Sequence, residues 1–224
     1  MKTIGCFVWV SLLGLATLAI ADDVQPAVAT QWRAGVATVK ITPDQPMYMA
    51  GYAARKEQAE GTEQDLFAKA LVIEDDRGHR AVLLTMDLIG VSDALRSMVA
   101  DRVRTQHGID PQSLLMNASH THCGPAYTRD DAHEYFEWLG AALVDVVGQA
   151  LADLQPAVLS YSQARCGFAM NRRTPTDRGY RNHPHPAGLV DHSVPVLSVS
   201  DPDGQHNLSD ARIPHFVMAK EDKL

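Results

Sequence analysis

The densest group of residues able to do chemistry is 117–125, which reads Asn-Ala-Ser-His-Thr-His-Cys-Gly-Pro. It continues a short apolar segment, 113–118, that predicts a buried strand. Residues two apart in an extended chain project to the same side, so His120 and His122 are expected to face one pocket beyond the strand end. Neutral imidazoles are good zinc ligands, and zinc activates water at neutral pH. The pair indicates a hydrolytic metal site, although two solvent-facing histidines would give the same spacing.

Other polar residues near predicted strand ends could support this site. Cys123 could be a soft ligand or a reactive thiol, but as the neighbour of His122 it is expected to point the opposite way, which favours packing or a disulfide. A bond to Cys166 stays open. Asp87 ends an apolar segment and could either orient a metal-bound histidine or cap a turn. Arg172 follows another apolar stretch, and an arginine beside a zinc site can hold a substrate oxygen or a developing oxyanion.

Strands alternate with helices along the chain, which predicts an α/β fold with a mixed sheet flanked by helices. Strand patterns occupy 35–41, 68–74, 80–88, 113–118, 158–166 and 194–199. The turn at 75–78 joins the second and third of these as an early β-hairpin. One helix is predicted from an N-cap at Ser92 to Gly108, and another from a capping-box-like start at Asp131 to the residues before Pro156.

The composition is that of an ordinary globular chain. Of the 224 residues, 46% are hydrophobic and 21% are charged, which excludes a disordered tail, a collagen-like repeat and a polytopic membrane protein. The formal net charge is −7, and no run of Lys or Arg occurs. Such a chain is a poor match to phosphate backbones, so we expect no nucleic-acid partner.

The sequence divides into four parts. Residues 1–21 combine a basic start, an apolar run and an Ala-Ile-Ala ending at Ala21, which is typical of a cleaved secretory signal peptide. The mature protein is therefore expected to be secreted or periplasmic. Residues 22–34 predict a flexible lead, 35–204 a single domain, and 205–224 a divergent, disordered tail. Because the tail shows no further strand pattern, we expect the domain to be truncated.

Six sequence elements together resemble one known family. They are Gly-Val-Ala-Thr-Val-Lys-Ile-Thr-Pro at 35–43, Met-Ala-Gly-Tyr at 49–52, Asp87, Ser-His-Thr-His-Cys-Gly-Pro at 119–125, Asn171-Arg172, and Val-Asp-His-Ser-Val-Pro-Val-Leu at 190–197. In this order they are similar to the N-terminal domain of the neutral/alkaline non-lysosomal ceramidase family. The resemblance runs from about residue 35 to residue 204.

The resemblance implies a secreted zinc amidase that splits ceramide into a sphingoid base and a fatty acid. By the family pattern, His120 is a ligand of one Zn²⁺, His122 lies beside the water that zinc activates, and Arg172 contacts the substrate. The expected partner is a ceramide-like N-acyl lipid, met through peripheral contact with a membrane surface. The family's second zinc histidine and its Glu and Tyr ligands are not found in this sequence. We therefore expect an incomplete zinc site, and whether this chain alone is an enzyme stays open.

The alternative is a secreted, non-catalytic protein of the same fold that binds a lipid or a surface. A metallo-β-lactamase-like hydrolase also starts from His-x-His, but it needs an Asp-His pair where this chain has Cys123 and Gly124. The segment with His183, His185 and His192 has prolines and glycines around it, and it predicts an exposed loop rather than a metal site.

Overall fold

A computed structural model describes residues 32–202 and 216–217 of the chain. Its strands form a seven-stranded sheet in the order β4-β3-β2-β1-β5-β8-β9 and a separate two-stranded ribbon, β6-β7. The elements are β1 (Trp32–Lys40), β2 (Phe67–Glu74), β3 (Arg80–Met86), α1 (Asp93–His107), η1 (Pro111–Ser113), β4 (Leu114–Ala118), η2 (Asp130–Ala132), α2 (His133–Ala152), β5 (Gln155–Arg165), β6 (Arg173–Thr176), β7 (Gly179–Asn182), β8 (Ser193–Ser200) and β9 (Phe216–Val217). The predicted signal peptide, residues 1–21, lies outside the described residues. No helix within the described ranges is long and apolar enough to cross a bilayer.

The sheet is mixed, which confirms the predicted α/β class. β1, β2 and β3 are antiparallel neighbours, and the tight turn between β2 and β3 is the predicted early hairpin. β3 and β4 run parallel, with α1 as the crossover between them. A parallel pair needs such a crossover because its strands begin at the same edge of the sheet.

The ends of the two helices agree only in part with the sequence patterns. α1 begins as predicted, because the Ser92 hydroxyl accepts a hydrogen bond from the Leu95 amide at 3.2 Å. It ends at Gly108 in the left-handed conformation, as glycine after a helix commonly does. The predicted capping box of α2 is wrong. Asp131 binds the Arg129 guanidinium at 2.9 and 3.0 Å instead, and the short turn η2 leads into the helix.

Two boundaries also differ from the predictions. β1 begins at Trp32, so the predicted flexible lead, 22–34, is wrong at its last three residues. These residues pair with β5, and Ala34 is fully buried. In the predicted disordered tail, 205–224, Phe216–Val217 pairs with β8. The rest of the lead and of the tail lies outside the described residues.

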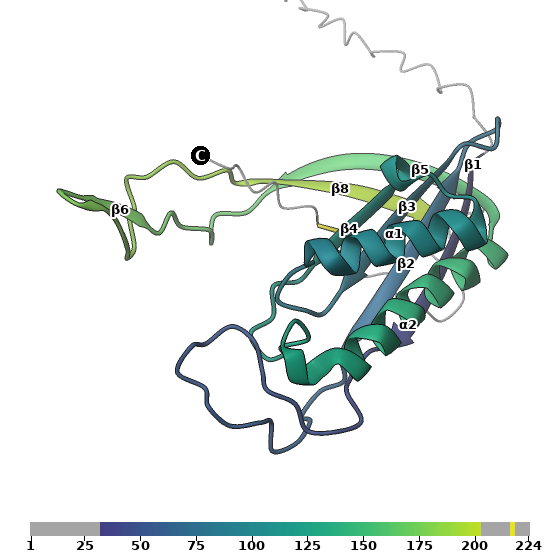
Figure 1. The fold of residues 1–224 in the computed structure, drawn as a ribbon. Coiled ribbons are helices and arrows are strands. Elements are labelled where there is room, and N and C mark those ends of the chain that lie inside the picture. The colour runs from purple at the N-terminus through teal and green to yellow at the C-terminus, as the bar shows by residue number, and fades with distance from the viewer. Residues whose placement is uncertain (1–31, 203–215, 218–224) are drawn as a thin grey trace, which may run out of the picture.

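The main core lies between the sheet and the two helices, which cover the same face (Figure 1). Both layers contribute large, fully buried side chains to it, among them Val72, Val82, Leu84, Met86, Leu95, Val99, Val103, Leu139 and Leu143. A smaller apolar cluster on the opposite face includes Leu71 and Ile73. Neighbouring residues of β2 therefore enter different cores, because successive side chains in a strand point to opposite faces.

β5 and β8 pair over eight residues and carry a long connection away from the helical layer. The ribbon β6-β7 lies within this connection, at the far end of the molecule (Figure 1). We call residues 165–189 the arm. Sequence reasoning missed the β6-β7 hairpin because its residues are polar, rich in Arg and Thr, and interrupted by Pro175.

Candidate active site

The candidate site lies where the parallel strands β3 and β4 end at the same edge of the sheet. His120 follows β4 by two residues, and Ile89 follows β3. The His120 Nδ1 atom lies 2.7 Å from the Ile89 carbonyl oxygen, which joins the two loops. A carbonyl can only accept, so Nδ1 carries the proton, and Nε2 keeps its lone pair free for a metal.

The two predicted histidines face each other. Their Nε2 atoms are 3.4 Å apart, and the ring centroids are 5.0 Å apart with an angle of 72° between the planes. The expectation that the two imidazoles lie on the same side is met, but not through the extended backbone on which it was based. His120 has φ = 60°, so a left-handed residue rather than an extended segment brings the rings together.

The ring of His122 lies against the loop that contains Gly51 and Tyr52. A Cβ atom on Gly51 would fall 2.4 Å from the His122 Cγ atom, so only glycine leaves room for the ring. The edge of the Tyr52 ring packs on the same imidazole, with centroids 4.8 Å apart. The His122 Nδ1 atom is buried and has no hydrogen-bond partner among the described residues. Packing and the Nε2 contact with His120 therefore fix this ring.

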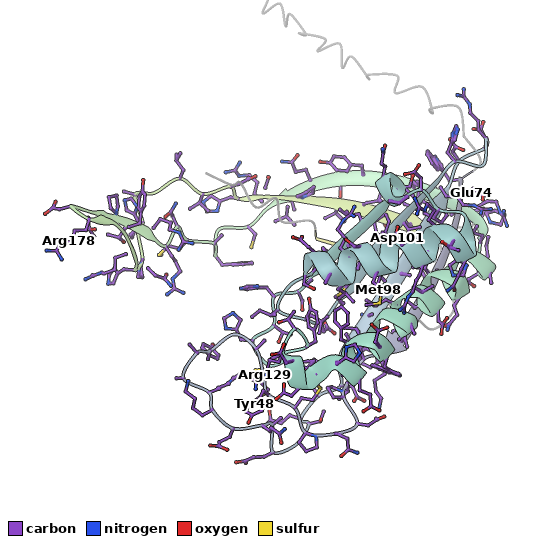
Figure 2. The ribbon with its side chains drawn as sticks, in the orientation of Figure 1. Tyr48, Glu74, Met98, Asp101, Arg129 and Arg178 are labelled. Carbon is purple, nitrogen blue, oxygen red and sulfur yellow. The ribbon has the colours of Figure 1, made fainter. Side chains whose placement is uncertain are left out.

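Backbone hydrogen bonds hold the 48–52 loop against residues 124–126, which follow the histidine pair. The Ala50 amide donates to the Gly124 carbonyl at 2.9 Å, and the Ala126 amide donates to the Tyr48 carbonyl at 2.7 Å. The Arg129 guanidinium covers the Tyr48 ring at 4.0 Å from its centroid, and Figure 2 shows these two side chains together. The loop after β1 is thus a wall of the site, although it contains no regular secondary structure.

Arg55 is a site residue that the sequence analysis missed. Its Nη1 atom donates to the backbone carbonyls of Ala50, at 3.1 Å, and of His122. Its guanidinium also lies 4.7 Å from the centroid of the Tyr52 ring. The motif at 49–52 was recognised, but no periodicity or spacing connects Arg55 to a histidine 67 residues later.

The structure settles two of the open alternatives. The Asp87 carboxylate accepts a hydrogen bond from the Phe67 amide at 3.0 Å, so it fastens the start of β2 to the end of β3 in the manner of a cap. Cys123 and Cys166 are both free thiols. Cys123 is exposed, and its Sγ atom lies 4.0 Å from the Arg55 guanidinium.

Arg172 and the histidine-rich segment lie on or beside the arm. The Arg172 carbonyl accepts from the His183 amide at 3.3 Å, and no interaction found among the described residues joins Arg172 to the histidine pair. The imidazoles of His185 and His192 each lie 3.1 Å from a backbone carbonyl oxygen. These contacts agree with a structural loop, as predicted.

The histidine pair fits a zinc ion in part. The Nε2 atom of His122 lies 3.4 Å from that of His120, close enough to contact a group bound to a metal that His120 holds. His120 has the expected second partner, a backbone carbonyl on its other ring nitrogen. Within the described ranges, however, no group of three or more His, Cys, Asp or Glu side chains could hold a metal. The described residues therefore supply part of a ligand set.

The fold and the site define a class of domain: an α/β sheet with a potential ligand site formed by the loops at the carboxyl edge of parallel strands. Comparison with known families identifies it further. The family described as neutral/alkaline non-lysosomal ceramidase, N-terminal, matches residues 32–186. The chain therefore belongs to this family, and the predicted resemblance is confirmed.

Individual relatives agree with this assignment. The neutral ceramidase of Pseudomonas aeruginosa is 28% identical over 215 residues, which cover 87% of this chain and 30% of that protein. The neutral ceramidase of Drosophila pseudoobscura pseudoobscura is 29% identical over 114 residues, or 50% of this chain and 16% of the relative. The crystal structure of the Pseudomonas enzyme has a similar fold, with a TM-score of 0.66 at 24% identity, covering 80% of this chain and 31% of that one. The chain thus spans about a third or less of these relatives.

Proposed function

We propose that this chain forms part of a zinc-dependent amide hydrolase that cleaves ceramide-like N-acyl lipids into a sphingoid base and a fatty acid. The observation that carries the proposal is the pair of facing Nε2 atoms of His120 and His122, 3.4 Å apart at the carboxyl edge of β3 and β4. Family membership supports the substrate class, since the relatives are named neutral ceramidases.

Each imidazole has a distinct task in this proposal. His120 presents the Nε2 lone pair as a metal ligand, because its Nδ1–H is engaged by the Ile89 carbonyl. His122 presents its Nε2 atom beside it, where an N–H can donate to an oxygen that gains charge in the transition state. When bound, zinc polarises an amide carbonyl and lowers the pKa of water. Arg172 is the proposed contact to the polar part of the substrate.

The proposal also assigns the place of reaction, which is a membrane surface. The arm carries five arginines and a single aspartate. Phe168 is 89% exposed and Leu189 is 83% exposed on it, and Arg178 lies at its far tip (Figure 2). Cationic and apolar side chains together suit the interface of an anionic bilayer. Co-sedimentation with phosphatidylcholine vesicles, with and without the anionic lipid phosphatidylglycerol, tests whether the arm binds a membrane surface. Equal binding to both kinds of vesicle would contradict an attraction between the arginines and anionic lipid.

One observation favours the non-catalytic alternative, a lipid- or surface-binding protein of the same fold. The described residues provide two facing imidazoles but no third metal ligand beside them. Catalytic zinc usually has three protein ligands, so we expect the isolated chain to bind zinc weakly or substoichiometrically. A tight one-to-one site in this chain would contradict that expectation.

The decisive experiment measures zinc content together with fatty-acid release from a short-chain labelled ceramide, with and without a chelator. The weak zinc binding expected of the wild type should be lost in His120→Ala. Whatever release the wild type shows should be lost in His120→Ala and lowered by about 100-fold or more in His122→Ala. The exposed His133→Ala is the matched control and should leave both unchanged. Release that is insensitive to the chelator would overturn the zinc mechanism. Lipid binding without zinc and without release would favour the alternative.

A further inference from the structure

A column of four side chains runs from the loop after β1 into the candidate site. The Arg55 guanidinium lies 4.7 Å from the centroid of Tyr52, and the Tyr52 ring lies 4.8 Å from that of His122. The His122 ring in turn lies 5.0 Å from the ring of His120. We infer that Arg55 is the positioning residue of this column, which holds the His122 imidazole against His120.

Arg55 acts on His122 from two directions. Its guanidinium stacks on the Tyr52 ring, which in turn packs on the His122 imidazole, and its Nη1 atom donates to the His122 backbone carbonyl. The same Nη1 atom also binds the Ala50 carbonyl at 3.1 Å, so one guanidinium fastens the loop to the site. A planar guanidinium can donate in its plane and stack on an aromatic face at the same time, which an ammonium group cannot do.

The His122 side chain has little else to fix its orientation. Among the residues that the structure describes, its Nδ1 atom is buried without a hydrogen-bond partner, and its Nε2 atom is hydrogen-bonded to the other imidazole of the pair. Loss of the guanidinium would therefore free both the carbonyl and the Tyr52 ring that hold this residue. Gly51 would then be the remaining packing contact on the ring from this loop.

The neighbouring cation provides a matched control. Lys56 is exposed, and its Nζ atom binds the Ala53 carbonyl at 3.0 Å, within the same turn. It carries the same charge as Arg55 but makes no contact with the site in the structure. A difference between variants at the two positions therefore reports the contacts of Arg55 and not the charge of the loop.

The inference rests on the proposed function only for its effect on zinc. The experiment uses the metal-free full-length chain and records the imidazole ¹H–¹⁵N signals of His122 and the nuclear Overhauser effects between the two rings. We expect Arg55→Met to shift the His122 signals and remove the ring-to-ring effect. Arg55→Lys should restore them in part, and Lys56→Met should match the wild type. An Arg55→Met spectrum with unchanged His122 signals and ring contacts would overturn the inference.

A second measurement separates positioning from general stability. Denaturant unfolding should change little for Arg55→Met, because the contacts lie on a surface loop outside the main core. If Arg55→Met fails to fold, the spectrum of Arg55→Lys tests the inference instead. A lysine keeps a hydrogen-bond donor but loses the planar guanidinium that stacks on the Tyr52 ring. Zinc affinity of Arg55→Met should stay near the wild-type value, because Arg55 contacts His122 and the proposed zinc ligand is His120. Zinc binding that does not depend on His120 would contradict the proposed function, while the ring spectra still decide the role of Arg55.

Discussion

Replacement of Gly51 by alanine would test whether the 49–52 loop sets the position of the His122 ring. Gly51 has φ = 98°, and an L-residue in such a region is strained by about 1–3 kcal/mol. The new Cβ atom would fall 2.4 Å from Cγ and 2.7 Å from Nδ1 of His122. Ordinary contact begins near 3.4 Å, so the ring would have to move by about 1 Å.

The rings of Tyr52 and His120 also pack on this imidazole, so the movement would disturb these contacts. We therefore expect Gly51→Ala to separate the two Nε2 atoms. The backbone strain and the repacking together should lower the free energy of unfolding by about 2–3 kcal/mol. For a domain of this size that corresponds to a melting temperature lower by roughly 4–12 °C.

Thermal unfolding and imidazole NMR spectra measure the two effects. Gly78→Ala controls for backbone strain, since Gly78 has φ = 80° but no atom within 4 Å of its Cβ position. Gly61→Ala controls for the loop, because it has neither feature. If Gly51→Ala unfolds like Gly78→Ala and its His122 signals stay at the wild-type positions, the loop does not set the ring and the reasoning is refuted.

Three further substitutions test the scaffold. Gly35→Ala would place a Cβ atom 2.1 Å from the Ala150 carbonyl oxygen in α2 and should lower the free energy of unfolding by about 3 kcal/mol in urea denaturation. Hydrogen bonding to Arg80, with a second arginine beside it, lowers the pKa of Glu74 below its ordinary value of 4.5. The ionised carboxylate therefore stabilises the folded state above pH 4.5, and this stabilisation is lost as the pH falls through the lowered pKa. Glu74→Gln should therefore cost about 1 kcal/mol at pH 7, and progressively less below pH 4.5. Burial raises the pKa of Tyr135, so the wild type should lose stability as pH rises above 10, and Tyr135→Phe should abolish this loss.

Each of these substitutions has an outcome that contradicts its reasoning. A wild-type melting temperature for Gly35→Ala would mean that β1 and α2 can separate at no cost. A deficit of Glu74→Gln that persists unchanged at pH 3 would show that its carboxylate does not act through ionisation. Tyr135→Phe also removes an O–H that donates to the Ile41 carbonyl at 2.6 Å, and losing this hydrogen bond should lower the free energy of unfolding at pH 7 by about 1 kcal/mol. An unchanged free energy of unfolding at pH 7 would contradict this expectation.

Most of the helices and strands can be predicted from the sequence because turn residues, helix caps and hydrophobic spacing indicate them locally. The hairpin at β2 and β3 follows from a turn between two apolar runs, and α1 follows from Ser92 and Gly108. The helical face of α2 is equally clear, since its buried residues recur at the helical spacing. What fails is the start of α2, where the Arg129 guanidinium competes for the Asp131 carboxylate.

The candidate site divides in the same way. His120 and His122 could be paired from the sequence because they are two residues apart. The contacts that fix them could not, since Ile89, Gly51 and Arg55 come from other loops and approach through backbone atoms or packing. Local spacing carries no signal for a guanidinium that binds a carbonyl 67 residues away.

The separation of the arm from the helical layer divides the molecule into regions of different local stability. The backbone amides of β2 lie between two apolar clusters, so their hydrogens should exchange with solvent only when the whole domain unfolds. β6 and β7 pair only with each other, and most of their side chains are exposed. Their amides should exchange through local opening, so deuterium would label the arm long before it reaches β2.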